Sequence, residues 1–272
     1  MASDTLAAAC RDLVQVYPAA DGPAHALRGI TLDVPARSIT AVVGPSGAGK
    51  STLLRLLACL ERPTVGEVLV GGRPTAHLSG RARRRLAARH IGYVFQTPSD
   101  NLLEYLTVAE HVRLAWRMRA AEPRGAVEAL LATTSLASLA DVRPDGLSAG
   151  EQQRVAFAMA VAGSPALVVA DEPTASLDPA STEALVEVLP ALVEDGQTLV
   201  IATHHPPIIE AADRVMVIRD GTLAAEADGD GELLAVVDPA GRIHLPPESG
   251  ELFAAGRARI TVHDGHLRVD PR

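Results

Sequence analysis

Short apolar runs alternate with amphipathic stretches along most of this chain. The runs at 39–43, 167–170, 199–202 and 215–218 are almost entirely aliphatic, whereas residues 53–60 place leucine at the i, i+3, i+4 and i+7 positions of a helix. Strands that are apolar on both faces are typical of a parallel sheet covered by helices. The pattern therefore predicts an α/β fold with a parallel central sheet.

Three of these runs end in residues that can carry chemistry. The first leads into a glycine-rich turn at Gly44, the second ends at Asp171 and Glu172, and the third ends at Thr203 and His204. In open parallel sheets, ligands bind at the carboxyl ends of the strands. We therefore expect a ligand site at that edge of the sheet.

Two regions depart from the alternation. Residues 97–162 are mainly helical in pattern, which predicts a helical subdomain inserted into the α/β core. After Gly221, glycine, aspartate and proline become frequent, and alternating runs such as 258–262 predict small β-hairpins. We expect a main domain at 1–221 and a small β-rich C-terminal module at 222–272.

The composition narrows the class of protein. Of the 272 residues, 47% are hydrophobic and 21% charged, which fits a packed core with one main domain and an appendage. The net charge of −8 and an aromatic content of 3% disfavour a nucleic-acid-binding surface. The sequence contains neither a run long enough to span a membrane nor the pattern of a signal peptide, so we expect a cytoplasmic protein. The two cysteines, Cys10 and Cys59, are expected to be reduced and buried.

Residues 44–51 match G-x-x-x-x-G-K-[ST] between a predicted strand and a predicted helix, the context that this phosphate-binding motif requires. Its glycines let backbone N–H groups turn toward phosphate oxygens, and the helix N-terminus favours negative charge. We expect Lys50 to reach the β- and γ-phosphates of a nucleoside triphosphate and Ser51 to ligate Mg²⁺. The predicted phosphate-contacting residues are Gly44, Pro45, Ser46, Gly47, Ala48, Gly49, Lys50, Ser51 and Thr52.

The acidic pair Asp171 and Glu172 has two interpretations. An aspartate at a strand end can hold the Mg²⁺ shell, and the next carboxylate can polarise an attacking water. Two acids that merely start a loop would look the same. The phosphate-binding motif in the same chain favours the catalytic interpretation.

Two helix starts also have a structural and a functional interpretation. Ser148 and Glu151 fit a capping box, and Ser148 with the Gly150 backbone would also make an anion site at the helix N-terminus. Asp178 followed by Pro179 fits an N-cap and a proline at the first helical position.

Three single residues also have both a structural and a functional interpretation. His204 fits a buried histidine or a hydrogen-bond donor to a γ-phosphate. Gln96 fits an ordinary loop glutamine or part of the site. Tyr17 fits a core residue or an aromatic ring that stacks on adenine.

Taken in order, these motifs resemble those of ABC transporter ATP-binding cassettes over about residues 6–221. The series comprises the phosphate-binding loop, Gln96, the Leu147–Glu151 signature with Gln152, Gln153 and Arg154, the segment 171–174, the segment 176–178, and Thr203 with His204. The resemblance implies a P-loop α/β core with an antiparallel β subdomain and an inserted helical subdomain.

The resemblance also implies roles for single residues. Tyr17 would stack on adenine, Glu172 would be the catalytic base, and His204 would be the switch histidine. Asp171 and Gln96, together with Ser51, would hold Mg²⁺. The ATP-contacting set would further include Ser148, Gly150, Glu151 and Asp178.

At the level of the whole protein, the resemblance implies an ATP-hydrolysing subunit that dimerises around two ATP molecules, with a homodimer expected. Each ATP would lie between Lys50 of one chain and Ser148 of the other. The dimer would drive a separate integral membrane permease and would sit on the inner face of the cell membrane. Segments at 60–68 and 91–96 resemble lipoprotein- and macrolide-exporter cassettes, whose permeases are FtsX-like.

Two alternatives stay open. The first is a soluble ABC-type ATPase that acts on nucleic acid or ribosomes, although such proteins usually carry two cassettes or a long coiled coil. The second concerns residues 237–246, which loosely resemble AbrB-like regulators. That stretch is either a β appendage that stabilises the dimer or a DNA-binding module, and the acidic net charge disfavours DNA.

Five positions depart from the family pattern. Ala149 replaces the second signature glycine and Glu151 stands where glutamine is common. Met159 replaces an arginine, and Arg37-Ser38 replaces Gly-Glu. None of these changes removes a catalytic group.

Overall fold

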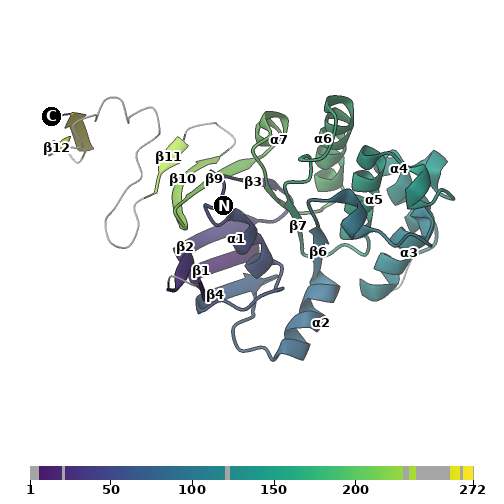
Figure 1. Ribbon diagram of the computed structural model, residues 1–272, viewed down its shortest axis with the longest axis horizontal. Coiled ribbons are helices and arrows are strands. Elements are labelled where there is room, and N and C mark those ends of the chain that lie inside the picture. Colours follow the sequence, from purple (N-terminus) through teal and green to yellow (C-terminus); the bar gives the residue numbers. More distant parts are fainter. Residues whose placement is uncertain are drawn as a thin grey trace.

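The computed structural model describes residues 6–19, 22–119, 123–228, 233–236, 258–263 and 266–271. Its main sheet has seven strands in the order β11-β10-β9-β3-β8-β7-β6 (Figure 1). The pairs β9–β3, β3–β8, β8–β7 and β7–β6 are parallel, and the two strands at the other edge are antiparallel. The α/β prediction is confirmed. The strands are β3 (Ile39–Val43), β6 (Ile91–Val94), β7 (Leu167–Asp171), β8 (Leu199–Ala202), β9 (Arg214–Arg219), β10 (Thr222–Asp228) and β11 (Leu233–Ala235).

Helices cover both faces of the main sheet. Val169 and Val200 pack on one side with the leucines of α1 (Lys50–Leu57). Val168 and Ile201 pack on the other side with α5 (Ala149–Val161) and α6 (Pro179–Glu194). Successive strand residues point to opposite faces, so strands with a core on each face must be apolar throughout.

Helix α1 is shorter than its leucine pattern suggests. It ends at Leu57, because Cys59 takes a left-handed backbone conformation with φ 56° just beyond it. Leu60, which the periodicity assigns to the buried face, is 49% exposed. The helix therefore does not extend to Leu60, although the leucine spacing predicts that it does. Both cysteines are free and buried, as expected.

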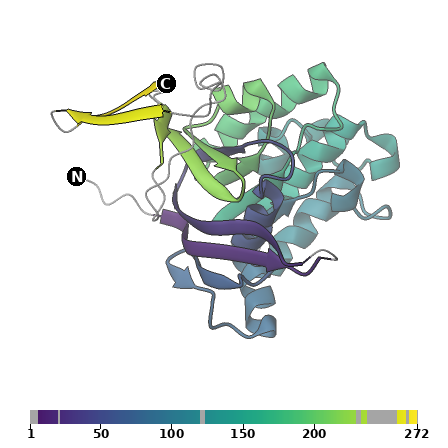
Figure 2. The same ribbon diagram turned by 60° about the vertical axis from the view of Figure 1, so that its left-hand side comes forward.

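A second, antiparallel sheet packs on the other side of α1, in the order β2-β1-β4-β5. Figure 2 shows its two long strands, in purple, side by side. A bulge bends β1 between Arg11 and Val14, and a Cβ at Gly66 would overlap the Asp12 carbonyl there. The strands are β1 (Leu6–Tyr17), β2 (Ala24–Pro35), β4 (Val65–Val70) and β5 (Arg73–Pro74).

The described residues between 97 and 162 form helices and loops without a strand, as their pattern indicates. They enclose a third apolar cluster that includes Val112, Leu131, Leu136 and Val155. The helical segments here are η1 (Pro98–Asn101), α3 (Val108–Arg119), α4 (Ala126–Thr133), η2 (Ala137–Leu139), η3 (Pro144–Gly146) and α5. Outside this region lie α2 (Gly80–His90) and α7 (Pro206–Glu210).

The C-terminal strands divide between two sheets. The turn at Asp220 and Gly221 joins β9 to β10, so residues 222–228 and 233–235 extend the main sheet. The boundary expected after Gly221 falls inside this hairpin. Strands β12 (Ala258–His263) and β13 (His266–Pro271) pair with each other in a sheet of their own, drawn in yellow in Figure 2. The segment 237–246, on which the AbrB-like resemblance rests, lies outside the described residues.

None of the described helices has the length and apolar character that crossing a membrane requires.

Candidate nucleotide-binding site

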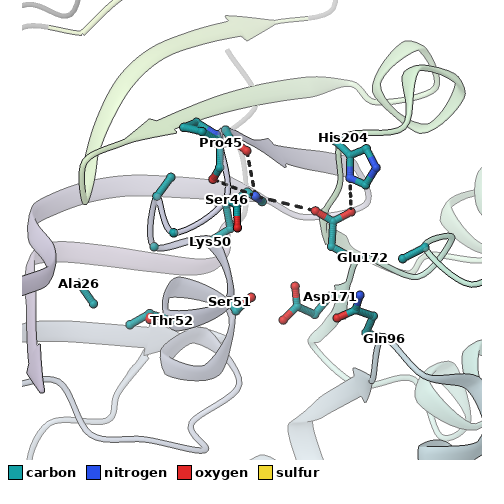
Figure 3. Close-up of a pocket in the computed structure, with 15 residues that line it drawn as sticks. Ala26, Pro45, Ser46, Lys50, Ser51, Thr52, Gln96, Asp171, Glu172 and His204 are labelled. Carbon is teal, nitrogen blue, oxygen red and sulfur yellow. Dashed lines mark hydrogen bonds and ion pairs between the residues drawn. The ribbon is translucent and has the colours of Figure 1, made fainter. Parts of the chain in front are cut away.

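A pocket of about 640 Å³ lies at the carboxyl ends of β3, β7 and β8. Figure 3 shows the residues that line it, which come from segments far apart in the sequence. The structure therefore brings together the predicted strand-end residues. The lining residues are Gly44 to Thr52, Gln96, Asp171, Glu172 and His204 from the predicted set, and Ala26 and Ala175 in addition.

The loop between β3 and α1 fits tightly against backbone from two other strands. Gly44 has φ 150°, and a Cβ there would overlap the Ile218 carbonyl oxygen of β9. Gly49 has φ 106°, and a Cβ there would lie 2.6 Å from the Ala26 carbonyl oxygen of β2. Only glycine satisfies both the backbone angles and the space. The motif glycines are thus required before any phosphate is considered.

Lys50 points its ammonium group back over this loop. Its Nζ donates to the Gly44 carbonyl at 2.8 Å and the Pro45 carbonyl at 3.3 Å. The same Nζ lies 3.8 Å from Oε1 of Glu172 (Figure 3). Three oxygens therefore surround the ammonium at the place where the motif predicts phosphate oxygens.

Glu172 also contacts His204. Its Oε2 lies 2.9 Å from Nδ1 of the histidine, which must carry the proton because a carboxylate only accepts. The Glu172 backbone has φ 46° and its N–H donates to the Ala202 carbonyl of β8 at 2.9 Å. A non-glycine residue in this conformation stores about 1–3 kcal/mol of strain, of the kind that clusters at functional sites. The His204 side chain is 75% exposed.

Asp171 points away from this pair. Figure 3 shows its carboxylate facing Ser51 on one side and Gln96 on the other. Its Oδ1 is buried and has no hydrogen-bond partner among the described residues. A buried carboxylate oxygen without a partner is unfavourable, and a hard divalent cation with oxygen ligands would satisfy it. The side chains of Asp171, Ser51 and Gln96 therefore fit a Mg²⁺ ion.

The signature residues lie at another helix start. Ser148 and Glu151 form the predicted capping box of α5: the Ser148 N–H donates to Glu151 Oε2 at 2.7 Å, and the Glu151 N–H donates to Ser148 Oγ at 3.3 Å. The Ser148 N–H and the Ser148 hydroxyl both donate to Glu151 Oε2, which lowers the pKa of the Glu151 carboxyl. A Cβ at Gly150 would lie 2.5 Å from the Ser181 Cβ of α6, so the two helices approach closely here.

Asp178 caps α6 as predicted. Its Oδ2 accepts from the Ser181 hydroxyl at 2.6 Å and its Oδ1 from the Ser181 N–H at 2.9 Å, which lowers the pKa of the Asp178 carboxyl. Within the part of the chain that the structure describes, neither Asp178 nor Ser148, Gly150 or Glu151 lines the pocket. One chain does not bring the signature to its own phosphate-binding loop.

Tyr17, at the end of β1, also stands outside the described pocket lining. Its hydroxyl donates to Oε2 of Glu61, and Oε1 of Glu61 lies 2.7 Å from Arg55. Burial first, and then the hydrogen bond with Glu61, raise the pKa of the Tyr17 hydroxyl. Sequence reasoning missed Glu61, because nothing in the local pattern shows that it meets a residue 44 positions away.

Comparisons with known proteins agree with this geometry. A family model described as ABC transporter matches residues 27–175. The chain is 39% identical, over 215 residues, to an uncharacterized ABC transporter ATP-binding protein of Thermotoga maritima, a match that covers 78% of this chain and 91% of the relative. The chain belongs to the ABC transporter ATP-binding family. The family and the ATP-hydrolase class predicted from the motifs are confirmed.

Other relatives of this ABC cassette extend the comparison. The macrolide export ATP-binding/permease protein MacB of Escherichia coli K12 is 37% identical over 216 residues, which is 78% of this chain but 33% of MacB. The chain thus spans about a third of the length of that relative. Among solved structures, the dimeric ABC transporter cassette MJ0796 matches with a TM-score of 0.72 and 31% identity over 83% of this chain and 100% of that one. A dimeric post-hydrolysis state of MJ0796 bound to ADP and Pi matches equally well.

Proposed function

We propose that this ABC cassette hydrolyses ATP with Glu172 as the catalytic base and thereby powers a membrane transporter. The observation that carries the proposal is the position of the Glu172 carboxylate, which contacts both Lys50 and His204 at the mouth of the phosphate-binding loop. A carboxylate held between two groups that recognise phosphate is placed to accept a proton from a water that attacks the γ-phosphorus.

Each neighbouring group has a distinct part in this reaction. Lys50 and the loop N–H groups bind the β- and γ-phosphates and hold them in line for attack. Ser51, Asp171 and Gln96 would hold Mg²⁺, which when bound neutralises charge that develops on the phosphate oxygens. His204, which is exposed enough to reorient, donates a hydrogen bond to the γ-phosphate. The new P–O bond replaces the bond to ADP, and inorganic phosphate leaves.

The site is completed by a second copy of the cassette. Ser148 and the N-terminus of α5 form an anion-binding helix start that does not line the described pocket of its own chain. We infer a head-to-tail homodimer in which Ser148, Gly150, Glu151 and Asp178 of one chain face the ATP of the other. The similarity to dimeric MJ0796 supports this arrangement.

An exposed groove on the helical region is the proposed contact with the permease. It has a volume of about 520 Å³ and is lined by Tyr105, Leu106 and Leu114 together with Glu110, Arg113 and Arg117. Tyr105 is 68% exposed, and Met118, one helical turn after Leu114 on α3, is 59% exposed. Exposed apolar groups rimmed by charge mark interaction sites. The similarity to MacB, an ATP-binding/permease protein, supports a permease partner, which would hold the cassette on the inner face of the membrane. An FtsX-like permease is what the resemblance of segments 60–68 and 91–96 to exporter cassettes implies.

The substitution Glu172→Gln tests the assigned base. We expect kcat for ATP hydrolysis to fall by about 10²–10⁴-fold with a small change in KM, because the amide keeps the shape of the side chain and cannot accept the proton. Glu187→Gln, an exposed position on α6, is the matched control and should stay within about twofold of the native enzyme. Hydrolysis by Glu172→Gln at the native rate would show that another group is the base.

A pull-down from native membranes tests the partner. The bait is full-length Glu172→Gln protein held with ATP and Mg²⁺, and mass spectrometry identifies what it retains. Recovery of an integral permease supports the transporter assignment. Recovery of ribosomes or nucleic acid without a membrane protein would replace it with the soluble-ATPase alternative.

A further inference from the structure

Helix α2 carries a row of arginines along one face. Four of its arginines follow the i, i+3, i+4 and i+8 spacing that places side chains on the same side of a helix. Leu86 and Ala87 are half-buried and belong to the face that packs on the core. The four arginines, all exposed, are Arg81, Arg84, Arg85 and Arg89.

No acidic side chain balances this row locally. The segment 68–99 contains neither aspartate nor glutamate, in a chain with 33 acidic residues and a net charge of −8. Among the residues that the structure describes, none of the four arginines forms an ion pair with a carboxylate. The chain thus concentrates positive charge on one helix although its overall charge is negative.

The row borders a small groove with an apolar wall. Arg85 and Arg89 line it together with Arg73 of β5, and its volume is about 270 Å³. Leu78 and Leu86 also line it. Guanidinium groups bind phosphate oxygens in bidentate fashion, so a groove with three arginines and apolar side chains suits a phosphate that is attached to a less polar group.

The row lies next to the proposed permease contact. Helix α2 packs against α3, and Figure 1 shows the two helices on the same side of the main sheet's β6 edge. Leu114 and Met118 of α3, both exposed, belong to the surface assigned above to the permease. The arginine row therefore lies on the helix that neighbours the proposed permease contact, which in that proposal places it near the membrane.

We propose that the arginine face of α2 binds the anionic phospholipid headgroups of the membrane that holds the permease. The location of this lipid-binding face near the membrane rests on the proposed transporter function. Its affinity for phosphate groups rests on the arginine row and the groove beside it. Four to eight basic residues on an amphipathic helix are typical of binding to acidic lipids. Nucleic acid is disfavoured, because residues 73–90 contain no tryptophan, tyrosine or phenylalanine on which a base can stack.

Vesicle flotation of the full chain tests the proposal. Vesicles rich in phosphatidylglycerol are compared with vesicles of phosphatidylcholine alone, for the native protein and for the triple variant Arg81→Gln, Arg84→Gln, Arg85→Gln. We expect the partition coefficient on the anionic vesicles to fall about 100-fold in the triple variant, since each arginine near an anionic surface contributes to binding. Binding of the native protein should weaken as salt shortens the Debye length.

Matched variants test whether vesicle binding depends on where the arginines lie or only on the total charge of the protein. The triple variant Arg37→Gln, Arg124→Gln, Arg143→Gln removes three arginines that are exposed elsewhere and should keep the partition coefficient within about threefold. Replacing Arg81, Arg84 and Arg85 with lysine keeps the charge and should keep most of the binding. Because all of these positions lie outside the phosphate pocket, ATP hydrolysis in solution should be unchanged in every variant.

Several results would overturn the proposal. Equal flotation of the two glutamine variants on the anionic vesicles would do so, as would equal flotation of the native protein on anionic and phosphatidylcholine vesicles. Complete displacement by inorganic phosphate would also do so, because it would indicate a site for a small anion. Retention on polyglutamate or duplex DNA in preference to anionic vesicles would assign the face to a protein or a nucleic acid. Loss of ATP hydrolysis by Glu172→Gln alongside any of these results would leave the ATPase assignment intact, so the two proposals fail separately.

Discussion

At the scale of single residues, the site depends on two neighbouring acids that face different partners. Asp171 is the last residue of β7 and faces Ser51 and Gln96, whereas Glu172 follows the strand and faces Lys50 and His204 (Figure 3). The left-handed backbone of Glu172 adds to this separation. In the proposed mechanism, this one short segment supplies both a Mg²⁺ ligand, Asp171, and the general base, Glu172, and the two carboxylates are directed at different partners.

Glu61 provides a residue-scale prediction about the adenine end of the site. Its carboxylate accepts from the Tyr17 hydroxyl and pairs with Arg55, so it restrains the ring proposed to stack on adenine. A hydrogen bond of this kind contributes about 0.5–1.5 kcal/mol. Glu61→Ala should therefore raise KM for ATP about two- to tenfold and leave kcat nearly unchanged, as measured by steady-state hydrolysis.

Two further variants make this result specific. Glu61→Gln keeps an acceptor for the Tyr17 hydroxyl and should recover most of the affinity. Glu104→Ala, at an exposed position, is the control and should leave KM as it is. An unchanged KM in Glu61→Ala would mean that the position of Tyr17 does not influence nucleotide binding.

At the scale of elements, helix starts carry much of the recognition chemistry. The phosphate-binding loop opens α1, the signature opens α5, and Asp178 opens α6. A helix N-terminus presents unpaired N–H groups and a favourable dipole for anions. At α5 and α6, side chains of the same chain already occupy these groups in part, so the caps both stabilise the helix and shape the surface that meets the other chain.

The capping box of α5 predicts a dependence of stability on pH. Hydrogen bonds from Ser148 lower the pKa of the Glu151 carboxyl below its ordinary value of 4.5. The contribution of the charged cap is therefore complete above pH 4.5 and is lost as the pH falls through the lowered pKa. At pH 7 the native protein should be more stable than Glu151→Gln by about 0.5–1 kcal/mol.

Urea unfolding of both proteins between pH 7 and pH 3 measures this difference. The native advantage in the free energy of unfolding should shrink below pH 4.5, since effects of the other acids are common to both proteins and cancel. Asp141→Asn, an exposed acid in the same region, is the control and should show a smaller dependence. A difference that stays constant with pH would exclude the charged capping interaction.

At the scale of the whole molecule, the fold separates the phosphate-binding loop from the signature residues at the start of α5. The start of α5 does not line the described phosphate pocket of its own chain, so in the proposed head-to-tail dimer the binding of ATP and the association of two chains are linked. A ligand that binds at an interface favours the associated state by mass action. We therefore expect ATP binding to hold two copies of the cassette together and ATP hydrolysis to release them.

Sedimentation of Glu172→Gln tests this linkage. With ATP and Mg²⁺ it should sediment as a dimer, and without nucleotide as a monomer. Adding Ser148→Glu should abolish the dimer, because a carboxylate at the anion-binding helix start repels the triphosphate of the opposite chain. Ser138→Glu, at an exposed position outside the proposed interface, should still dimerise. Dimerisation of the Ser148→Glu protein would contradict the head-to-tail arrangement.

Much of this molecule follows from local rules. The strands at 39–43 and 199–202 have the bounds that their apolar runs indicate, and the caps at Ser148 and Asp178 form the hydrogen bonds that their spacing indicates. The positive φ angles of Gly44 and Gly49 are a local reason for glycine in the loop, whereas the close backbone contacts with Ile218 and Ala26 come from the tertiary structure. The local features among these depend on residues within a few positions of each other, which is the range over which a sequence pattern carries physical information.

Only the tertiary structure decided which residues that are far apart in the sequence come into contact. It brought His204 to Glu172 over 32 positions and Tyr17 to Glu61 over 44, and it added β10 and β11 to the main sheet. It also placed the arginines of α2 beside α3. Contacts of this kind depend on the order of strands and the packing of layers, and the spacing of apolar residues specifies neither of these. The sequence by itself determined the chemistry of each segment, and the fold determined which segments share a site.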